Sequence, residues 1–182
     1  MTKYAFLTDI HLDCLPAAKL ESFLQGLSDQ SKDVDGYLIS GDISTAPLLE
    51  KHLRLLLTAC EKSIFFCLGN HDFWYGSIAN IQRNVHVLSR EYSIDWPCIY
   101  YVNSYQYIPL TPKTDVVGHD GWYDGLHGDA RGSTFLMNDW WNIAEFNKIS
   151  RISQNRFGSR IDWIGKQKVI ELSQELASKA AT

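Results

Sequence analysis

The sequence lacks the features that mark membrane proteins and general nucleic-acid-binding proteins. Its longest apolar stretches, such as Leu53–Cys60, contain a charged residue and are far too short to span a bilayer. Its 17 Lys and Arg residues stand against 21 Asp and Glu residues and form no basic block. A protein that binds nucleic acid regardless of base sequence needs clustered positive charge. We therefore expect neither membrane association nor general nucleic-acid binding.

The sequence also lacks paired cysteines and the common nucleotide and hydrolase motifs. No Cys-x-x-Cys pair is present, and no long apolar segment of signal-peptide type follows Met1. We expect a reducing, cytoplasmic compartment in which the cysteines are small core residues. The cysteines are Cys14, Cys60, Cys67 and Cys98. Without a P-loop, a Gly-x-Gly-x-x-Gly or a Gly-x-Ser-x-Gly motif, nucleotide-driven motors, dinucleotide enzymes and serine hydrolases are excluded.

The residues that are present predict an α/β domain. The chain has 182 residues, 45% of them hydrophobic, which is enough for one domain with a sizeable core. In its first third, short apolar runs alternate with segments in which leucines recur at helical spacing. This alternation is typical of a parallel sheet with helices on both faces. The expected strands are Tyr4–Thr8, Tyr37–Ser40 and Ile64–Leu68, and the expected helices are Pro16–Gln30 and Pro47–Glu61.

The pattern changes after a further helix, which we expect over Ser77–Tyr92. Short strand candidates separated by turn residues follow, and two helices come last. No internal repeat or interdomain linker divides the chain, so we expect residues 1–182 to form a single domain. The later strands are expected at Ile99–Val102, Tyr105–Leu110 and Asp115–Val117, and the last helices at Asp139–Ser150 and Ile161–Ala180.

Polar residues follow each of the first three expected strands. The three blocks are Asp9-Ile10-His11, Gly41-Asp42 and Gly69-Asn70-His71-Asp72. Ligands of an open parallel sheet bind beyond the carboxyl ends of its strands, so we expect these side chains at one edge. Nitrogen and oxygen donors without a thiolate suit Mn, Fe or Zn. A carboxylate between two clusters, such as Asp42, is placed to bridge two cations ~3.5–4 Å apart.

Two of the blocks begin with a glycine, and all three blocks also allow an interpretation without a metal. We expect Gly41 and Gly69 to turn the chain sharply out of a buried strand, with backbone angles that a Cβ would penalise. In the alternative, Asp9, Asp42 and Asp72 are helix caps, and the two histidines are ordinary loop residues. That alternative explains any one block, but three blocks at three strand ends favour a metal site.

The three blocks resemble, in order and spacing, the first three signature blocks of the calcineurin-like metallophosphoesterases, over the chain as far as Tyr75. The segment Val116–Asp124 is similar to a later strand and loop of bacterial members. The resemblance implies a layered α/β metallophosphoesterase fold, with a mainly parallel sheet flanked by helices. It also implies a binuclear metal centre that hydrolyses phosphomonoesters, phosphodiesters or pyrophosphates.

The resemblance implies a set of metal ligands. Asp9 and His11 would bind the first cation, Asp42 would bridge both, and Asn70 would bind the second. The nucleophile would be a hydroxide that bridges the metals and attacks phosphorus in line, without a covalent protein intermediate.

The resemblance also implies two catalytic residues. His71 would not be a ligand but would stabilise or protonate the leaving-group oxygen, and Asp72 would orient it in a His–carboxylate pair. Next to these residues, aromatic side chains are candidates for a wall against a flat substrate group. They are Trp74, Tyr75 and Trp122, with packing of a long loop as the alternative.

The chain departs from the family pattern in its second half. The later histidine block and the Gly-His-x-His block are missing, because glycine stands in place of the second histidine in Gly118–Gly121. We interpret His52 and His86, inside expected helices, as packing or surface residues. His119 and His127 remain candidates to approach the site from a loop, with His119 a further candidate for substrate binding.

The missing histidines weaken the second cation site, which keeps only Asp42 and Asn70. The chain ends after its last helix, where the family begins its next strand. We therefore expect the N-terminal part of a longer enzyme, with the second sheet incomplete and an apolar face or edge exposed. Two hypotheses follow. The chain hydrolyses a small-molecule or nucleotide-type phosphate ester, or it is an incomplete phosphoesterase that acts through a partner chain completing the fold.

Overall fold

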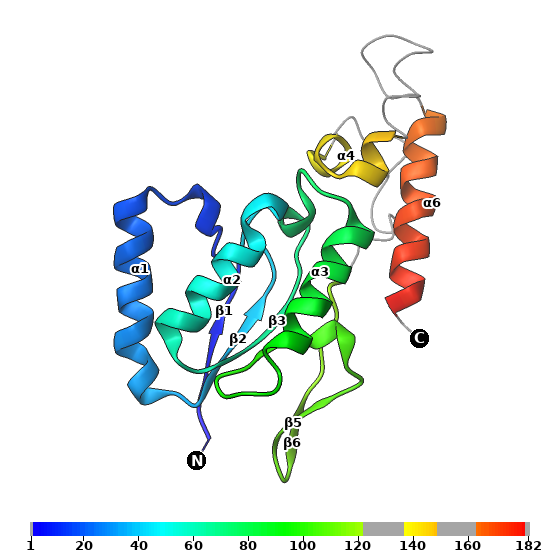
Figure 1. The fold of residues 1–182 in the computed structure, drawn as a ribbon. Coiled ribbons are helices and arrows are strands. Elements are labelled where there is room, and N and C mark those ends of the chain that lie inside the picture. Colours follow the sequence, from blue (N-terminus) through cyan, green and yellow to red (C-terminus); the bar gives the residue numbers. More distant parts are fainter. Residues whose placement is uncertain (1, 122–136, 149–162, 181–182) are drawn as a thin grey trace.

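A computed structural model describes residues 2–121, 137–148 and 163–180 of the protein (Figure 1). Its centre is a four-stranded parallel sheet in the order β1-β2-β3-β4. Leu7, Ile39, Phe66 and Tyr101 pair across all four strands in a single row. The strands are β1 (Tyr4–Leu7), β2 (Gly36–Ser40), β3 (Ser63–Cys67) and β4 (Ile99–Tyr101).

Each pair of neighbouring strands is connected by a helix. The helices are α1 (Ala17–Gln30), α2 (Ala46–Cys60) and α3 (Ile78–Glu91). Because the strands lie side by side in chain order, right-handed crossovers place all three helices on the same face (Figure 1). Side chains of that face, such as Ile39 and Phe66, share one core with Leu53 of α2. Our expectation of helices on both faces is therefore wrong for these helices.

The other face of the sheet packs against a β-hairpin. Strands β5 (Ile108–Thr111) and β6 (Thr114–Val116) pair antiparallel, and Ile108 shares a second, smaller apolar cluster with Phe65 of β3. At the β1 edge of this face, Phe6 is 65% exposed. The fold class is confirmed as α/β, with a parallel sheet flanked by helices and a small antiparallel sheet.

The C-terminal helices differ in part from the expected ones. Helix α4 covers Asp139–Asn142 and is interrupted at Ile143, which has an extended backbone, before helical backbone resumes over 144–148. The interruption places Ile143 and Phe146 in the main core, where both are fully buried. Helix α6 covers Trp163–Ala180, close to the predicted range. Within the described ranges, no helix has the length and apolar character needed to cross a membrane.

Short 3-10 helices complete the described elements. One of them carries His71 and Asp72 of the third polar block, and another begins directly after His11 of the first block. Val102, expected at the end of a strand, begins a 3-10 helix instead. These elements are η1 (Leu12–Cys14), η2 (Ser31–Asp33), η3 (His71–Phe73) and η4 (Val102–Ser104).

Candidate metal centre

The three polar blocks meet at the carboxyl ends of β1, β2 and β3. The backbone N–H of Asp9 donates to the carbonyl oxygen of Gly41 at 3.3 Å, and that of His11 donates to the carbonyl oxygen of Asp42 at 3.0 Å. The N–H of His71 donates to Oδ1 of Asp42, also at 3.0 Å. The second block is thus hydrogen-bonded to both of the others, and the three blocks lie together at the edge that the strand pattern predicted.

Three residues of these blocks have left-handed backbone conformations. The φ angles are 52° for Asp9, 39° for His11 and 50° for Asp42. Residues other than glycine adopt this region infrequently and at a cost in energy, and they persist where neighbouring structure holds them. Here the hydrogen bonds between the blocks supply that support. Strain of this kind clusters at functional sites, and no sequence pattern predicted it.

The two glycines are required for different reasons. Gly41 has a φ of +79°, as its predicted role needs, and a Cβ on it would lie 2.5 Å from the backbone nitrogen of Gly69. Gly69 itself has an ordinary φ. A Cβ there would lie 2.2 Å from Oδ1 of Asp42, so glycine leaves room for the carboxylate. Space, rather than backbone angle, therefore requires the second glycine.

His11, Asp42 and His71 form a compact donor group. Their ligand atoms all lie within 4.8 Å of one another, and His11 Nε2 is 3.7 Å from Asp42 Oδ2. The two imidazole rings meet edge to face, with centroids 4.6 Å apart. The side chain of His11 is 30% exposed and that of Asp42 is 13% exposed, so solvent reaches the group. Two imidazoles and a carboxylate fit one divalent cation of the Mn, Fe or Zn type and leave further positions open.

The remaining predicted ligands lie beside this group. The carboxylate of Asp9 accepts a hydrogen bond from the Thr8 hydroxyl and is not part of the group. Asn70 donates through Nδ2 to Oδ1 of Asp139 at 2.7 Å. His71, expected to contact the leaving group rather than a cation, belongs to the donor group.

Asp72 does not orient His71 as expected. Its Oδ1 accepts from the N–H groups of Ile43 and Ser44 at 2.9 and 2.8 Å, and its Oδ2 accepts from Gly69 N–H at 2.8 Å. Among the described residues, no hydrogen bond joins Asp72 to the His71 ring. Complete burial raises the pKa of Asp72 to about 7, against the opposing effect of the three N–H donors. Asp72 therefore ties the backbone that follows the second block to the third block through three backbone N–H groups.

Trp74 supports the His71 ring. The two rings are stacked, with centroids 3.6 Å apart and an angle of 23° between their planes. Trp74 Nε1 donates to Oδ1 of Asp139 at 2.6 Å. Tyr75, the other described member of the expected aromatic wall, is 65% exposed. Trp122 and His127 lie outside the described residues.

Asp139 is the site residue that sequence reasoning missed. It lies at the start of α4, is 1% exposed, and holds both Asn70 and Trp74 through a single carboxylate oxygen. Its position in the sequence gave no signal, because its partners are 69 and 65 residues away.

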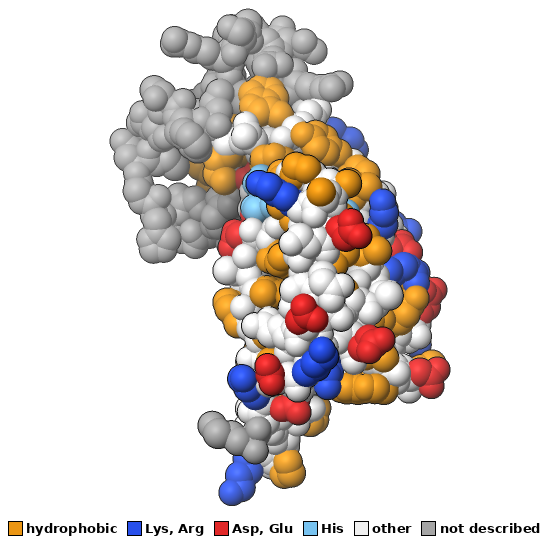
Figure 2. Space-filling model, turned by 90° about the vertical axis from the view of Figure 1, so that its left-hand side faces the viewer, with side chains coloured by type: hydrophobic (Ala, Val, Ile, Leu, Met, Phe, Trp, Pro, Cys, Tyr) orange, Lys and Arg blue, Asp and Glu red, His pale blue; other side chains and the backbone are white. Residues whose placement is uncertain are grey.

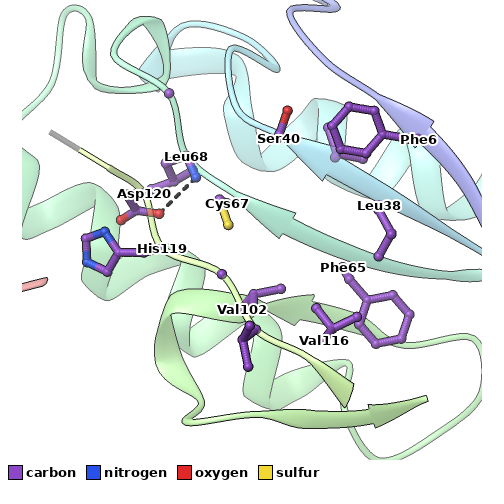
Figure 3. A pocket seen from close by; sticks show the side chains of 14 residues that line it. Phe6, Leu38, Ser40, Phe65, Cys67, Leu68, Val102, Val116, His119 and Asp120 are labelled. Carbon is purple, nitrogen blue, oxygen red and sulfur yellow. Dashed lines mark hydrogen bonds between the residues drawn. The ribbon is translucent and has the colours of Figure 1, made fainter. Parts of the chain in front are cut away.

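A cavity lies on the hairpin side of the sheet, near the strand ends (Figure 3). Its walls are apolar, with Phe6, Leu38 and Phe65 among them, and His119 and Asp120 stand at its polar end. His119 is exposed and accepts from Gly121 N–H at 2.9 Å through Nδ1. Among the described residues, His119 is not part of the donor group.

Asp120 anchors the loop that carries His119. Its Oδ1 accepts from Leu68 N–H at 2.9 Å, and its Oδ2 accepts from Gln82 Nε2 and Asn103 Nδ2 at 3.1 and 3.2 Å. The Tyr101 hydroxyl also donates to Oδ2. Burial raises the pKa of Asp120. This network fixes the end of β3 just before the third block.

Two further histidines have the packing and surface positions expected. His52 is 3% exposed and shares a hydrogen bond of 2.8 Å with the Ser44 hydroxyl, and burial lowers its pKa. His86 is exposed on α3 and bonds the Ser104 hydroxyl at 2.8 Å. On the surface drawn in Figure 2, acidic and basic side chains are interspersed, and histidine reaches the surface in the upper half of the view.

Comparisons with known proteins identify one family. Residues 2–174 match the family described as calcineurin-like phosphoesterase. Comparisons with curated proteins and with solved structures found no significant match.

Proposed function

Because the chain belongs to the calcineurin-like phosphoesterase family, we propose that it hydrolyses a phosphate ester with a divalent cation held by His11, Asp42 and His71. The family supports metal-dependent hydrolysis of phosphoesters in general. The observation that carries the proposal for this chain is the donor group itself, with its ligand atoms within 4.8 Å at the carboxyl ends of three parallel strands.

The protein's own residues prepare this position. His71 N–H binds Oδ1 of Asp42, which leaves Oδ2 directed to the side of His11, 3.7 Å from its Nε2. Trp74 holds the His71 ring by stacking, so the imidazole does not need to be ordered when a cation binds. When bound, a divalent cation supplies a water molecule of lowered pKa and neutralises the charge of the phosphate.

A second cation, as the family resemblance implies, would be held by Asp42 and Asn70. We propose that it binds more weakly than the first, because two protein ligands give less affinity than three. The substrate is proposed to be a small-molecule or nucleotide-type phosphate ester. The exposed ring of Tyr75, next to the site, supports a substrate with a flat group.

The cysteines support the proposal of a reducing compartment such as the cytoplasm. All four are free thiols, although Cys14 is exposed rather than a core residue as expected. Burial raises the pKa of Cys60 to about 12 and that of Cys67 to about 11, so both thiols stay protonated and unreactive near neutral pH. Their role is packing.

A second candidate function is favoured by the open face of the sheet. Phe6 and Val117, which line the cavity there, are 65% and 70% exposed. Such apolar exposure supports the alternative that a partner chain covers this face and completes an otherwise incomplete phosphoesterase. Light scattering of the purified chain across a concentration series tests self-association as one form of this partnership.

The test of the first proposal is hydrolysis of an aryl phosphomonoester and an aryl phosphodiester by the purified chain, with and without Mn²⁺. We expect turnover that requires the metal and is lost in Asp42→Asn, which keeps the shape of the side chain but weakens a ligand. Asp115→Asn, on the exposed hairpin, is the matched control and retains turnover. A folded chain with no metal-dependent turnover would contradict the proposal and favour the second candidate.

A further inference from the structure

Asp139 reaches the site from a distant part of the chain. Its Oδ1 accepts two hydrogen bonds, from Asn70 Nδ2 at 2.7 Å and from Trp74 Nε1 at 2.6 Å. The side chain is 1% exposed. One carboxylate oxygen thus contacts both a predicted metal ligand and the ring that supports His71.

We propose that Asp139 is a positioning residue for the metal centre, fixing the side-chain amide of Asn70 and the indole of Trp74. The inference rests on the proposed function, since it assigns Asp139 to the same site. It concerns the orientation of two neighbours rather than any contact of Asp139 with substrate.

The hydrogen bond to Asp139 sets the orientation of the Asn70 side-chain amide. An asparagine amide has a donor end and an acceptor end, whereas an ionised carboxylate only accepts. The bond to Asp139 therefore selects the NH₂ end of Asn70 and leaves its carbonyl oxygen free. Oxygen is the end of an amide that binds a cation. Asp139 thus decides which end of Asn70 is available to a metal.

Asp139 also fixes the indole ring of Trp74. Trp74 has a single donor, Nε1–H, and Asp139 accepts it. Hydrogen bonds to a carboxylate are stronger than neutral ones, so the ring plane is well fixed. The same ring is stacked on His71 with centroids 3.6 Å apart. Asp139 therefore restricts the His71 imidazole through Trp74.

The burial of Asp139 argues against a role in stability alone. Its Oδ2 is buried and has no hydrogen-bond partner among the described residues. An unsatisfied buried carboxylate oxygen destabilises a fold, and such arrangements are expected where function requires them. Attachment of this segment to the body is also provided by Glu145, which accepts from the Ser77 hydroxyl at 2.9 Å and from Ile78 N–H at 3.0 Å.

The test replaces Asp139 by the isosteric amide. In Asp139→Asn, the amide oxygen can still accept from Asn70 and Trp74, but it lacks the charge that makes hydrogen bonds to a carboxylate strong, so both side chains are held less firmly. We expect the dissociation constant for Mn²⁺, measured by calorimetry with the metal alone, to rise about 10- to 100-fold, as for other residues that orient metal ligands. Glu145→Gln is the matched control, because it weakens the attachment of the same segment without contacting Asn70. Its Mn²⁺ affinity stays at the wild-type value.

A double variant separates positioning from a general loss of structure. If Asp139 acts on the metal in part through Asn70, then Asp139→Asn costs less Mn²⁺ affinity in the Asn70→Ala background than in the wild-type background. An additive loss of affinity would contradict the Asn70 route. Wild-type affinity in a folded Asp139→Asn would overturn the inference while leaving the proposed function intact. Absence of Mn²⁺ binding by the wild type would instead contradict the proposed function.

Hydrogen exchange in the wild type tests the same inference even if Asp139→Asn does not fold. The side-chain NH₂ of Asn70 and the indole N–H of Trp74 are identified in NMR spectra by their loss in Asn70→Ala and Trp74→Phe. We expect both groups to exchange with solvent far more slowly than free side chains. Exchange at the free rate for either group would contradict the positioning role.

Discussion

Oδ1 of Asp42 lies 2.2 Å from the position that a Cβ on Gly69 would occupy. The carboxylate of the second block is thus seated against the backbone of the third, where the His71 N–H also holds it. A glycine at the end of β3 and an aspartate at the end of β2 are therefore parts of one arrangement. The position of the carboxylate depends on the absence of a side chain 27 residues later.

The first prediction concerns this glycine. Gly69→Ala displaces the Asp42 carboxylate, because real Cβ contacts never approach so closely. We expect a loss of about 1–3 kcal/mol in the free energy of unfolding, measured with urea, together with weaker Mn²⁺ binding.

Gly26→Ala is its control. Gly26 lies inside α1, and a Cβ there has no heavy atom within 4 Å. Alanine at this position should stabilise the protein by about 0.5–1 kcal/mol, since glycine is a poor helix former. Unchanged metal affinity in Gly69→Ala would show that the seating of Asp42 does not matter for the site.

A second prediction decides the role of His71. If it is a ligand, His71→Gln weakens Mn²⁺ binding as much as His11→Gln does, because each removes one imidazole of the donor group. This is the result we expect from calorimetry. His86→Gln, at an exposed position on α3, should bind Mn²⁺ like the wild type. Normal Mn²⁺ affinity in His71→Gln with reduced turnover would instead assign His71 to the leaving group.

A third prediction follows from the buried imidazole of His52. Burial lowers its pKa from the ordinary value of 6.5, so below that pH the unfolded chain binds a proton that the folded protein resists. The contribution of His52 to stability should therefore fall as the pH decreases below about 6.5 and reach its full value above it. In His52→Gln this part of the acid sensitivity disappears, as measured by urea unfolding between pH 5 and 8. An identical pH dependence in the wild type and His52→Gln would refute the assignment, and His86→Gln should keep the wild-type slope.

A fourth prediction compares the two faces of the sheet. Phe66 is fully buried beneath the helices, so Phe66→Ala should lower the free energy of unfolding by about 3–5 kcal/mol. Phe6 is 65% exposed on the other face, so Phe6→Ser should change stability by less than about 0.5 kcal/mol. A large loss in Phe6→Ser would mean that this face is covered in solution, and size-exclusion chromatography would then identify a self-associated form.

Much of the site could be predicted because its determinants are local. Apolar runs that end in Asp9, Gly41 and Gly69 define both the strands and the edge where their polar residues meet. The faces covered by helices could not be predicted in the same way, because they depend on the order of strands in space. Had β1 lain elsewhere in the sheet, the same sequence pattern would have placed α1 on the opposite face.

The hydrogen-bond partners of individual side chains could not be predicted from the sequence either. Asp72 stands next to His71 in the chain, yet it binds backbone N–H groups of Ile43 and Ser44. Asp139 contacts Asn70 from 69 residues further along the chain. In both cases tertiary packing, rather than sequence spacing, selects the partner.

The central claim is that His11, Asp42 and His71 together hold a divalent cation. Anomalous X-ray scattering from crystals of the protein soaked with Mn²⁺ tests it most directly. We predict a strong anomalous peak within coordination distance of the two imidazoles and of Asp42 Oδ2, and its absence in Asp42→Asn crystals. An anomalous peak at another position, or no peak at a Mn²⁺ concentration that supports hydrolysis, would contradict the claim.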